Sequence, residues 1–67
     1  MKLYQRWVYE AIQEFDFETS FTTYEIIARI VDKKGNSNFI GNISQTANYC
    51  SRYARKVAKG TYRRKRT

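Results

Sequence analysis

The sequence predicts a small α+β domain made of three helices and a C-terminal β-hairpin. Apolar residues recur at helical spacing over residues 2–15. Two further apolar runs, over residues 23–34 and 43–54, each follow a helix-capping signal. Gly60 then stands between short runs of strand-forming residues, which is typical of a hairpin turn. Because the chain has 67 residues, we expect a single domain, 1–67.

The first helix is predicted over residues 2–15 and is amphipathic. Its apolar side chains are expected to face the core: Leu3, Trp7, Val8, Ala11, Ile12 and Phe15. Residues 16–21 follow as a connector, in which Phe17 and Phe21 alternate with polar residues. We expect this connector to contribute one short strand at most.

The second helix is predicted to begin at a capping box. Thr22 would cap the backbone N–H groups and Glu25 would reach back to it. Four side chains are expected to point inward: Ile26, Ile27, Ile30 and Val31. Lys33 and Lys34 favour the helix dipole in the last turn. Gly35 is placed to end the helix in a left-handed conformation.

The third helix is predicted to begin at a second capping signal, Asn42-Ile43-Ser44-Gln45. Four apolar residues make one narrow stripe along it: Ile43, Ala47, Cys50 and Ala54. In the loop before this helix, Phe39 and Ile40 are expected to pack onto the core. The predicted core of the whole domain comprises Trp7, Ile12, Phe15, Ile27, Ile30, Ile43, Ala47 and Cys50.

The hairpin is predicted over residues 55–64 in one of two registers. A two-residue loop would require a positive φ at Lys59 and would set three pairs of residues opposite each other, Val57 with Tyr62, Lys56 with Arg63, and Arg55 with Arg64. A three-residue loop with Gly60 as the left-handed residue is the alternative. Residues 62–67 form a basic strand end, which is expected to finish as a loose tail.

Charge is divided unequally between the two halves of the chain. Residues 1–32 carry three Lys or Arg and six Asp or Glu, a net charge of −3, whereas residues 33–67 carry ten Lys or Arg and no acid, which adds +10 and gives +7 in total. Like charges repel in a folded state, so this distribution predicts a polyanionic partner. The alternative is a solubilising surface with a frayed basic end.

The predicted order of elements resembles the winged helix-turn-helix family of DNA-binding domains over nearly the whole chain. The matching segments are residues 21–27, which open the second helix, residues 42–49, which open the third, and residues 57–62, which stand where the family has its wing. Small archaeal, viral and plasmid regulators often have this order of elements. The eight residues of 35–42 exceed the turn of the simplest helix-turn-helix and leave the angle between the two helices open.

The residues themselves also point to nucleic acid. On the third helix, the positions outside the apolar stripe carry short amides, hydroxyls and arginines, which are expected to face outward: Ser44, Gln45, Asn48, Ser51, Arg52 and Arg55. Asn and Gln can pair with adenine and Arg with guanine in the major groove. The hairpin supplies cations for the phosphate backbone: Lys56, Lys59, Arg63 and Arg64. We therefore predict duplex DNA binding, in transcription regulation or DNA packaging.

Two other functions and one oligomeric state are also compatible with the sequence. An RNA-bound structural or ribosomal component would gain support if Tyr49, Tyr53 and Tyr62 all faced solvent for stacking. A protein-interaction module of the same fold would bind an acidic partner. A homodimer could form through the aromatic-rich start of the first helix, at Leu3, Tyr4 and Trp7.

Catalysis, cofactors and membranes are not expected. The chain has no His, the commonest general base and metal ligand. Glu10 and Glu14 lie one helical turn apart and could hold a metal, but a solvated helix face is the favoured interpretation. Cys50 is the single cysteine, so no internal disulfide is possible, and a cytoplasmic location is expected. No apolar run is long enough to span a bilayer.

Overall fold

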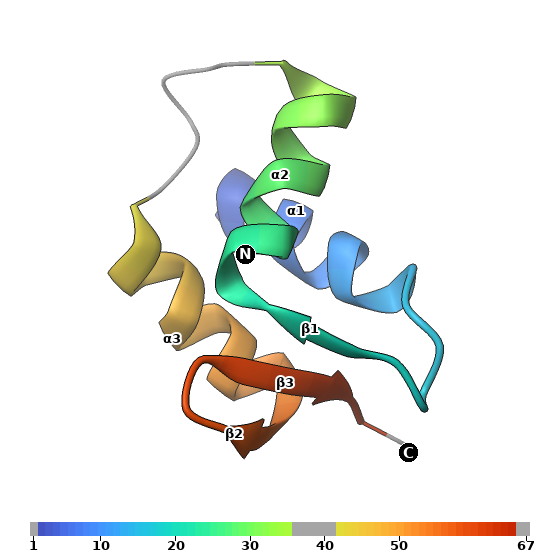
Figure 1. The fold of residues 1–67 in the computed structure, drawn as a ribbon. Coiled ribbons are helices and arrows are strands. Elements are labelled where there is room, and N and C mark those ends of the chain that lie inside the picture. The colour runs from blue at the N-terminus through green and yellow to red at the C-terminus, as the bar shows by residue number, and fades with distance from the viewer. Residues whose placement is uncertain (1, 36–41, 66–67) are drawn as a thin grey trace.

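The computed structural model describes residues 2–35 and 42–65, which form a small α+β domain (Figure 1). In chain order the elements are α1 (Leu3–Gln13), β1 (Ser20–Thr22), α2 (Thr23–Lys34), α3 (Ile43–Tyr53), β2 (Ala54–Ala58) and β3 (Thr61–Arg64). The predicted class, three helices with a C-terminal hairpin, is confirmed at this level. The prediction that Phe39 and Ile40 pack onto the core concerns residues outside the described ranges.

The three strands form one antiparallel sheet in the order β1-β3-β2, so β3 is the central strand (Figure 1). The connector after α1 does contribute a short strand, because Phe21 of β1 pairs with Tyr62 of β3. Both of these side chains are buried, and their rings stack with centroids 6.3 Å apart. The pair links the start of α2 to the hairpin, although its members are 41 positions apart in the chain.

The hairpin has a register that differs from the predicted two-residue arrangement. Ala58 pairs with Thr61 across the turn, but a bulge at Val57 then shifts the ladder so that Lys56 faces Tyr62 and Arg55 faces Arg63. Gly60 takes the left-handed position with φ of 72°, and Lys59 avoids a positive φ. The bulge leaves Val57 exposed while Ala54 and Tyr62 stay in the core, which explains why the simple alternation failed.

Both predicted helix caps are present. The Thr22 hydroxyl accepts a hydrogen bond from the Glu25 amide at 3.2 Å, and the Asn42 side chain accepts one from the Gln45 amide at 2.7 Å. At the end of α2, Gly35 has φ of 74° and its amide donates to the Val31 carbonyl. Local signals therefore set where α2 and α3 begin and where α2 ends.

The predicted core is partly wrong in both α1 and α3. Leu3, the first residue of α1, was expected to face the core but is 46% exposed. Four of the eight predicted residues are buried (Ile12, Phe15, Ile30 and Cys50), and three are half-buried (Trp7, Ile27 and Ala47). Ile43 is 47% exposed, which contradicts the prediction. The buried side of α3 instead carries Thr46, Tyr49 and Cys50. Relative to the predicted stripe, the helix is rotated about its own axis by somewhat less than the angle between two successive residues.

A polar contact holds α3 in this orientation. The Tyr4 hydroxyl and the Thr46 hydroxyl lie 2.6 Å apart in the interior, and the rings of Tyr4 and Tyr49 are 6.2 Å apart. Burial raises the pKa of Tyr4. Burial also raises the pKa of the neighbouring Cys50 thiol to about 11, so this cysteine is an inert core residue. Neither Tyr4 nor Thr46 belongs to the core that the sequence predicts.

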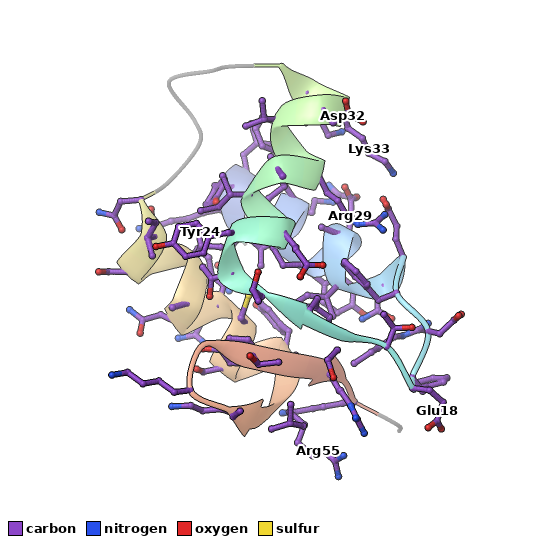
Figure 2. All side chains as sticks on the ribbon, viewed as in Figure 1. Glu18, Tyr24, Arg29, Asp32, Lys33 and Arg55 are labelled. Carbon is purple, nitrogen blue, oxygen red and sulfur yellow. The ribbon has the colours of Figure 1, made fainter. Side chains whose placement is uncertain are left out.

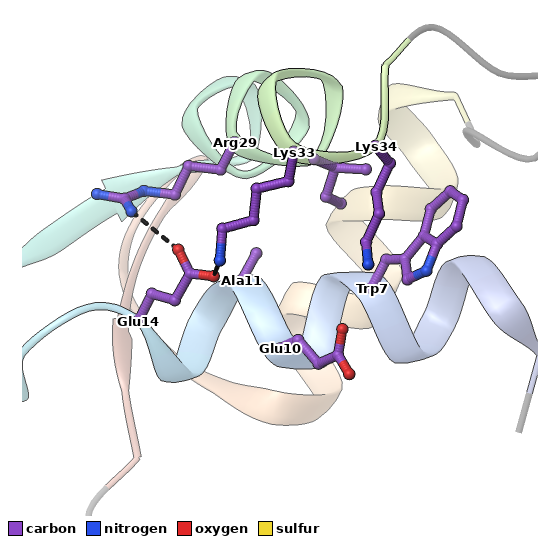
Figure 3. Close-up of a pocket in the computed structure, with 8 residues that line it drawn as sticks. Trp7, Glu10, Ala11, Glu14, Arg29, Lys33 and Lys34 are labelled. Carbon is purple, nitrogen blue, oxygen red and sulfur yellow. Dashed lines mark hydrogen bonds and ion pairs between the residues drawn. The ribbon is translucent and has the colours of Figure 1, made fainter.

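An ion-pair cluster joins α1 to α2 on the opposite side of the domain from α3 (Figure 3). Glu14 accepts a hydrogen bond from Arg29 at 3.1 Å and another from Lys33. In the same cleft, the Lys34 ammonium lies 5.5 Å from the centre of the Trp7 ring. The hydrogen bond from Lys33 is the main reason why the pKa of Glu14 is below its ordinary value of 4.5. Glu14 is therefore a structural anchor between the two helices.

We expect Glu14→Gln to destabilise the protein near neutral pH by an amount that shrinks in acid. Because the folded state lowers the pKa of Glu14, its carboxylate stabilises the fold above the ordinary value of 4.5, and this contribution is lost as the pH falls through the lower folded value. Thermal midpoints of the wild type and the variant from pH 7 downward test this. Glu10→Gln is the control, since the Glu10–Arg6 pair is exposed. A pH-independent difference would mean that packing, not charge, causes the effect.

Candidate nucleic-acid interface

The outward face of α3 is a strip of short polar side chains. Ser44, Asn48 and Ser51 lie opposite the buried side of the helix, and all three are exposed. Half-buried Ala47 lies between them, so no large side chain shields the strip. A helix with such a surface can approach base edges closely, because Asn can pair with adenine and Ser can bond to a base or a phosphate.

Gln45 lies toward the edge of this strip and is partly engaged by the fold. Its side-chain amide donates to the Tyr49 hydroxyl at 3.3 Å, one turn further along α3. The Ser51 hydroxyl lies 3.5 Å from the Tyr62 hydroxyl at the opposite end of the helix. Five of the six predicted residues of α3 and its end are exposed, and Gln45 is half-buried. The exposed five are Ser44, Asn48, Ser51, Arg52 and Arg55.

Arg52 and Arg55 continue this surface at the C-terminal end of α3. Both are exposed, and α3 passes directly into β2 at Ala54, so they stand on either side of the junction. Figure 2 shows Arg55 extending below the sheet, away from the helices. Arg55 also faces Arg63 across the hairpin, so one pair of like charges stands directly opposed.

The four predicted cations of the hairpin fall into two groups. Lys56 and Lys59 lie at and near the turn and are exposed. Arg63 donates from its Nε to the Ser20 hydroxyl at 3.0 Å. Arg64 donates to the Phe15 carbonyl at 3.3 Å and stacks its guanidinium on Phe17, 4.4 Å from the ring centre. The two lysines are thus available to a partner, whereas the two arginines also hold the sheet together.

The fold concentrates positive charge on this side of the molecule. Residues 42–65 contain seven Lys or Arg and no acid, and they make up all of α3, β2 and β3. The Glu14 carboxylate, at the C-terminal end of α1, is paired with Arg29 and Lys33. Residues 42–65 therefore supply no carboxylate that could neutralise their seven cations.

Sequence reasoning missed three exposed side chains that border this surface. Tyr24 is 67% exposed and extends from the start of α2 (Figure 2). Ile43 and Val57 are exposed at the start of α3 and at the hairpin bulge. An apolar side chain on a recognition helix can contact a thymine methyl group. The exposure of Tyr24 could have been predicted, because Tyr24 is the second residue after the Thr22 cap of α2. The exposure of Ile43 and Val57 depends on tertiary packing.

Two further features of residues 2–35 and 42–65 concern metal binding and membrane insertion. These ranges contain no group of three or more His, Cys, Asp or Glu placed to hold a metal ion. None of their helices has the length and the apolar character needed to cross a membrane. The dimer surface predicted at the start of α1 loses one member, since Tyr4 is buried and only Leu3 is well exposed.

Comparisons with protein families, with curated proteins and with solved structures find no match for this chain.

Proposed function

We propose that the protein is a winged helix-turn-helix domain that binds duplex DNA, with α3 in the major groove and the hairpin on the phosphate backbone. The order helix, strand, helix, helix, hairpin supports this assignment, together with the pairing of β1 to β3 in a three-stranded sheet. Transcription regulation and DNA packaging are the two roles that such binding would serve.

One observation carries the proposal above the others. The outward strip of α3, Ser44, Asn48 and Ser51, is narrow and uncharged, and it lies within a segment whose only ionised side chains are cations. A helix face that serves only for solvation usually carries pairs of Glu and Lys. Short hydrogen-bonding groups flanked by Lys and Arg instead fit a groove whose floor is base edges and whose walls are phosphates.

The tyrosines weigh against the RNA-bound alternative. That function was expected to leave Tyr49, Tyr53 and Tyr62 facing solvent, where bases could stack on them. Tyr49 and Tyr62 are 9% and 3% exposed, and Tyr53 is half-buried. Two of the three rings are therefore core residues. The acidic-protein partner remains the competing binding function, and the experiment below separates it from nucleic acid.

We expect the protein to bind duplex DNA more tightly than hairpin RNA of equal length, with strong salt dependence. If about six phosphates are contacted, the slope of log K against log salt is about −5, and affinity falls about a thousandfold between 50 and 200 mM salt. Titrations of duplex DNA, single-stranded DNA and hairpin RNA at several salt concentrations measure this. A salt-independent affinity, or a clear preference for the RNA, would overturn the proposal.

A further inference from the structure

Two adjoining hollows lie at the C-terminal end of α3, beside the end of β3. They have volumes of about 370 and 230 Å³ and share the side chains of Phe17, Arg64 and Lys65. The smaller hollow extends between Tyr9 of α1 and Tyr53 of α3. The larger hollow falls within the range of about 300–1,000 Å³ that is usual for small-molecule sites. We call the two together the α1–α3 groove.

The groove is cationic. Among the described residues that line it, four carry positive charge and none carries negative charge: Arg52, Arg55, Arg64 and Lys65. The Lys65 ammonium donates to the Arg52 carbonyl at 3.2 Å, which fixes the end of β3 against α3. The Arg64 Nε is buried and has no hydrogen-bond partner among the described residues. Asp16 and Glu18 flank Phe17 in the chain but line neither hollow.

The groove is also aromatic. Tyr9 is 42% exposed and meets Tyr53 edge to face, with ring centroids 5.4 Å apart. The Tyr53 hydroxyl accepts a hydrogen bond from Gln5, so this ring is held in place from α1. On the other wall the Arg64 guanidinium stacks on Phe17. Fixed aromatic rings beside cations are the two components of a surface that binds single-stranded nucleic acid, where bases stack and phosphates pair with Lys or Arg.

The groove is continuous with the proposed duplex interface. Arg52 and Arg55 are predicted members of the duplex interface, and they also line the groove, Arg52 in the smaller hollow and Arg55 in the larger one. A backbone that follows α3 toward its C-terminal end would therefore reach the groove without crossing an acidic side chain of residues 42–65.

From this juxtaposition we propose that the α1–α3 groove binds an unpaired nucleotide next to the duplex, so that the preferred ligand is a junction between double-stranded and single-stranded DNA. The base stacks against Tyr9, and its phosphates pair with Arg52 and the cations at the end of β3. The proposal rests on the proposed duplex binding and adds to it a second site with its own ligand chemistry.

The test compares a blunt duplex with the same duplex carrying a single-stranded overhang of about four nucleotides at either its 3′ or its 5′ end. We expect one of the two overhangs to raise the affinity about tenfold, the gain that one stacked base supplies. A third ligand carries an overhang of abasic nucleotides, which has the same phosphates without bases. With this abasic overhang, most of the increase in affinity should be lost.

Variants then assign the gain to the groove. Tyr9→Leu should abolish it and leave the affinity for the blunt duplex unchanged, whereas Tyr9→Phe should keep it. Tyr24→Leu is the matched control, because Tyr24 is an exposed aromatic residue that does not line the groove. The unchanged affinity of Tyr9→Leu for the blunt duplex shows that this variant is folded.

The outcomes separate this proposal from the proposed function. No binding to the blunt duplex would remove the proposed function itself. Binding to the blunt duplex with no gain from either overhang, or a gain that persists with abasic nucleotides or in Tyr9→Leu, would overturn only the junction site. An oligoglutamate peptide that binds in a Tyr9-dependent manner, together with no overhang gain, would assign the groove to an acidic protein segment instead.

Discussion

Phe21→Ala is expected to be strongly destabilising. Phe21 is fully buried, and its ring stacks on Phe15 with centroids 4.6 Å apart and on Tyr62 at 6.3 Å. Removing a buried Phe costs about 3–5 kcal/mol. A domain of 67 residues has a total stability of about 3–10 kcal/mol. The single substitution therefore removes a large part of the free energy of unfolding.

Thermal and urea denaturation followed by circular dichroism measure this loss. A change of about 3–5 kcal/mol should lower the midpoint of a domain this small by more than about 12 °C. Tyr24→Ala is the matched control, since it removes an aromatic ring that is 67% exposed and should shift the midpoint little. Equal midpoints for the two variants would show that the β1–β3 pairing does not hold the core together.

Asn48→Ala and the double variant Lys56→Ala, Lys59→Ala are expected to affect DNA binding in different ways. Asn48 lies in the middle of the outward strip of α3, so its loss should cost about 1–3 kcal/mol on a preferred site and much less on random DNA. Lys56 and Lys59, at and near the hairpin turn, are exposed and are proposed to contact phosphates. Their loss should weaken binding to every duplex alike and flatten the salt slope by about two units.

The measurement is the ratio of affinities for a selected site and for random duplex, at several salt concentrations. Each variant serves as the control for the other, because one should change the ratio and the other the slope. Lys56 and Lys59 are better choices than Arg63 and Arg64, whose bonds to Ser20 and to the Phe15 carbonyl would confound binding with folding. A wild-type ratio in Asn48→Ala would mean that α3 does not read bases, and would favour architectural binding.

The sequence was a good guide wherever a signal acts over a few residues. Thr22 and Asn42 cap the amides three positions later, so the starts of α2 and α3 could be placed from four-residue patterns. Gly35 and Gly60 both take positive φ, as their positions after a helix and within a hairpin turn predicted. The segregation of charge was equally visible, because it depends only on which residues occur in which half of the chain.

The orientation of α3 could not be predicted in the same way. Hydrophobicity favours burying Ile43 rather than Thr46, and it is the wrong guide here because the Thr46 hydroxyl has a partner in Tyr4, 42 positions away in the chain. The bulge at Val57 has a similar origin, since it depends on Ala54 and Tyr62 both remaining in the core. The double role of Arg64, which packs on Phe17 and bonds to the Phe15 carbonyl, also depends on distant residues.

The position of β3 in the sheet determines when the domain can close during synthesis. β3 is the central strand, yet it is the last of the described elements to be made, and β1 pairs with it alone. While the ribosome is adding residues 35–60, the helices that precede and follow β1 in the chain are complete, but no strand is yet available to pair with β1. The helices can form early from local contacts, whereas the sheet must wait for residues 61–64 to emerge. Formation of the sheet is therefore a late step in folding, in which β3 pairs with both β1 and β2.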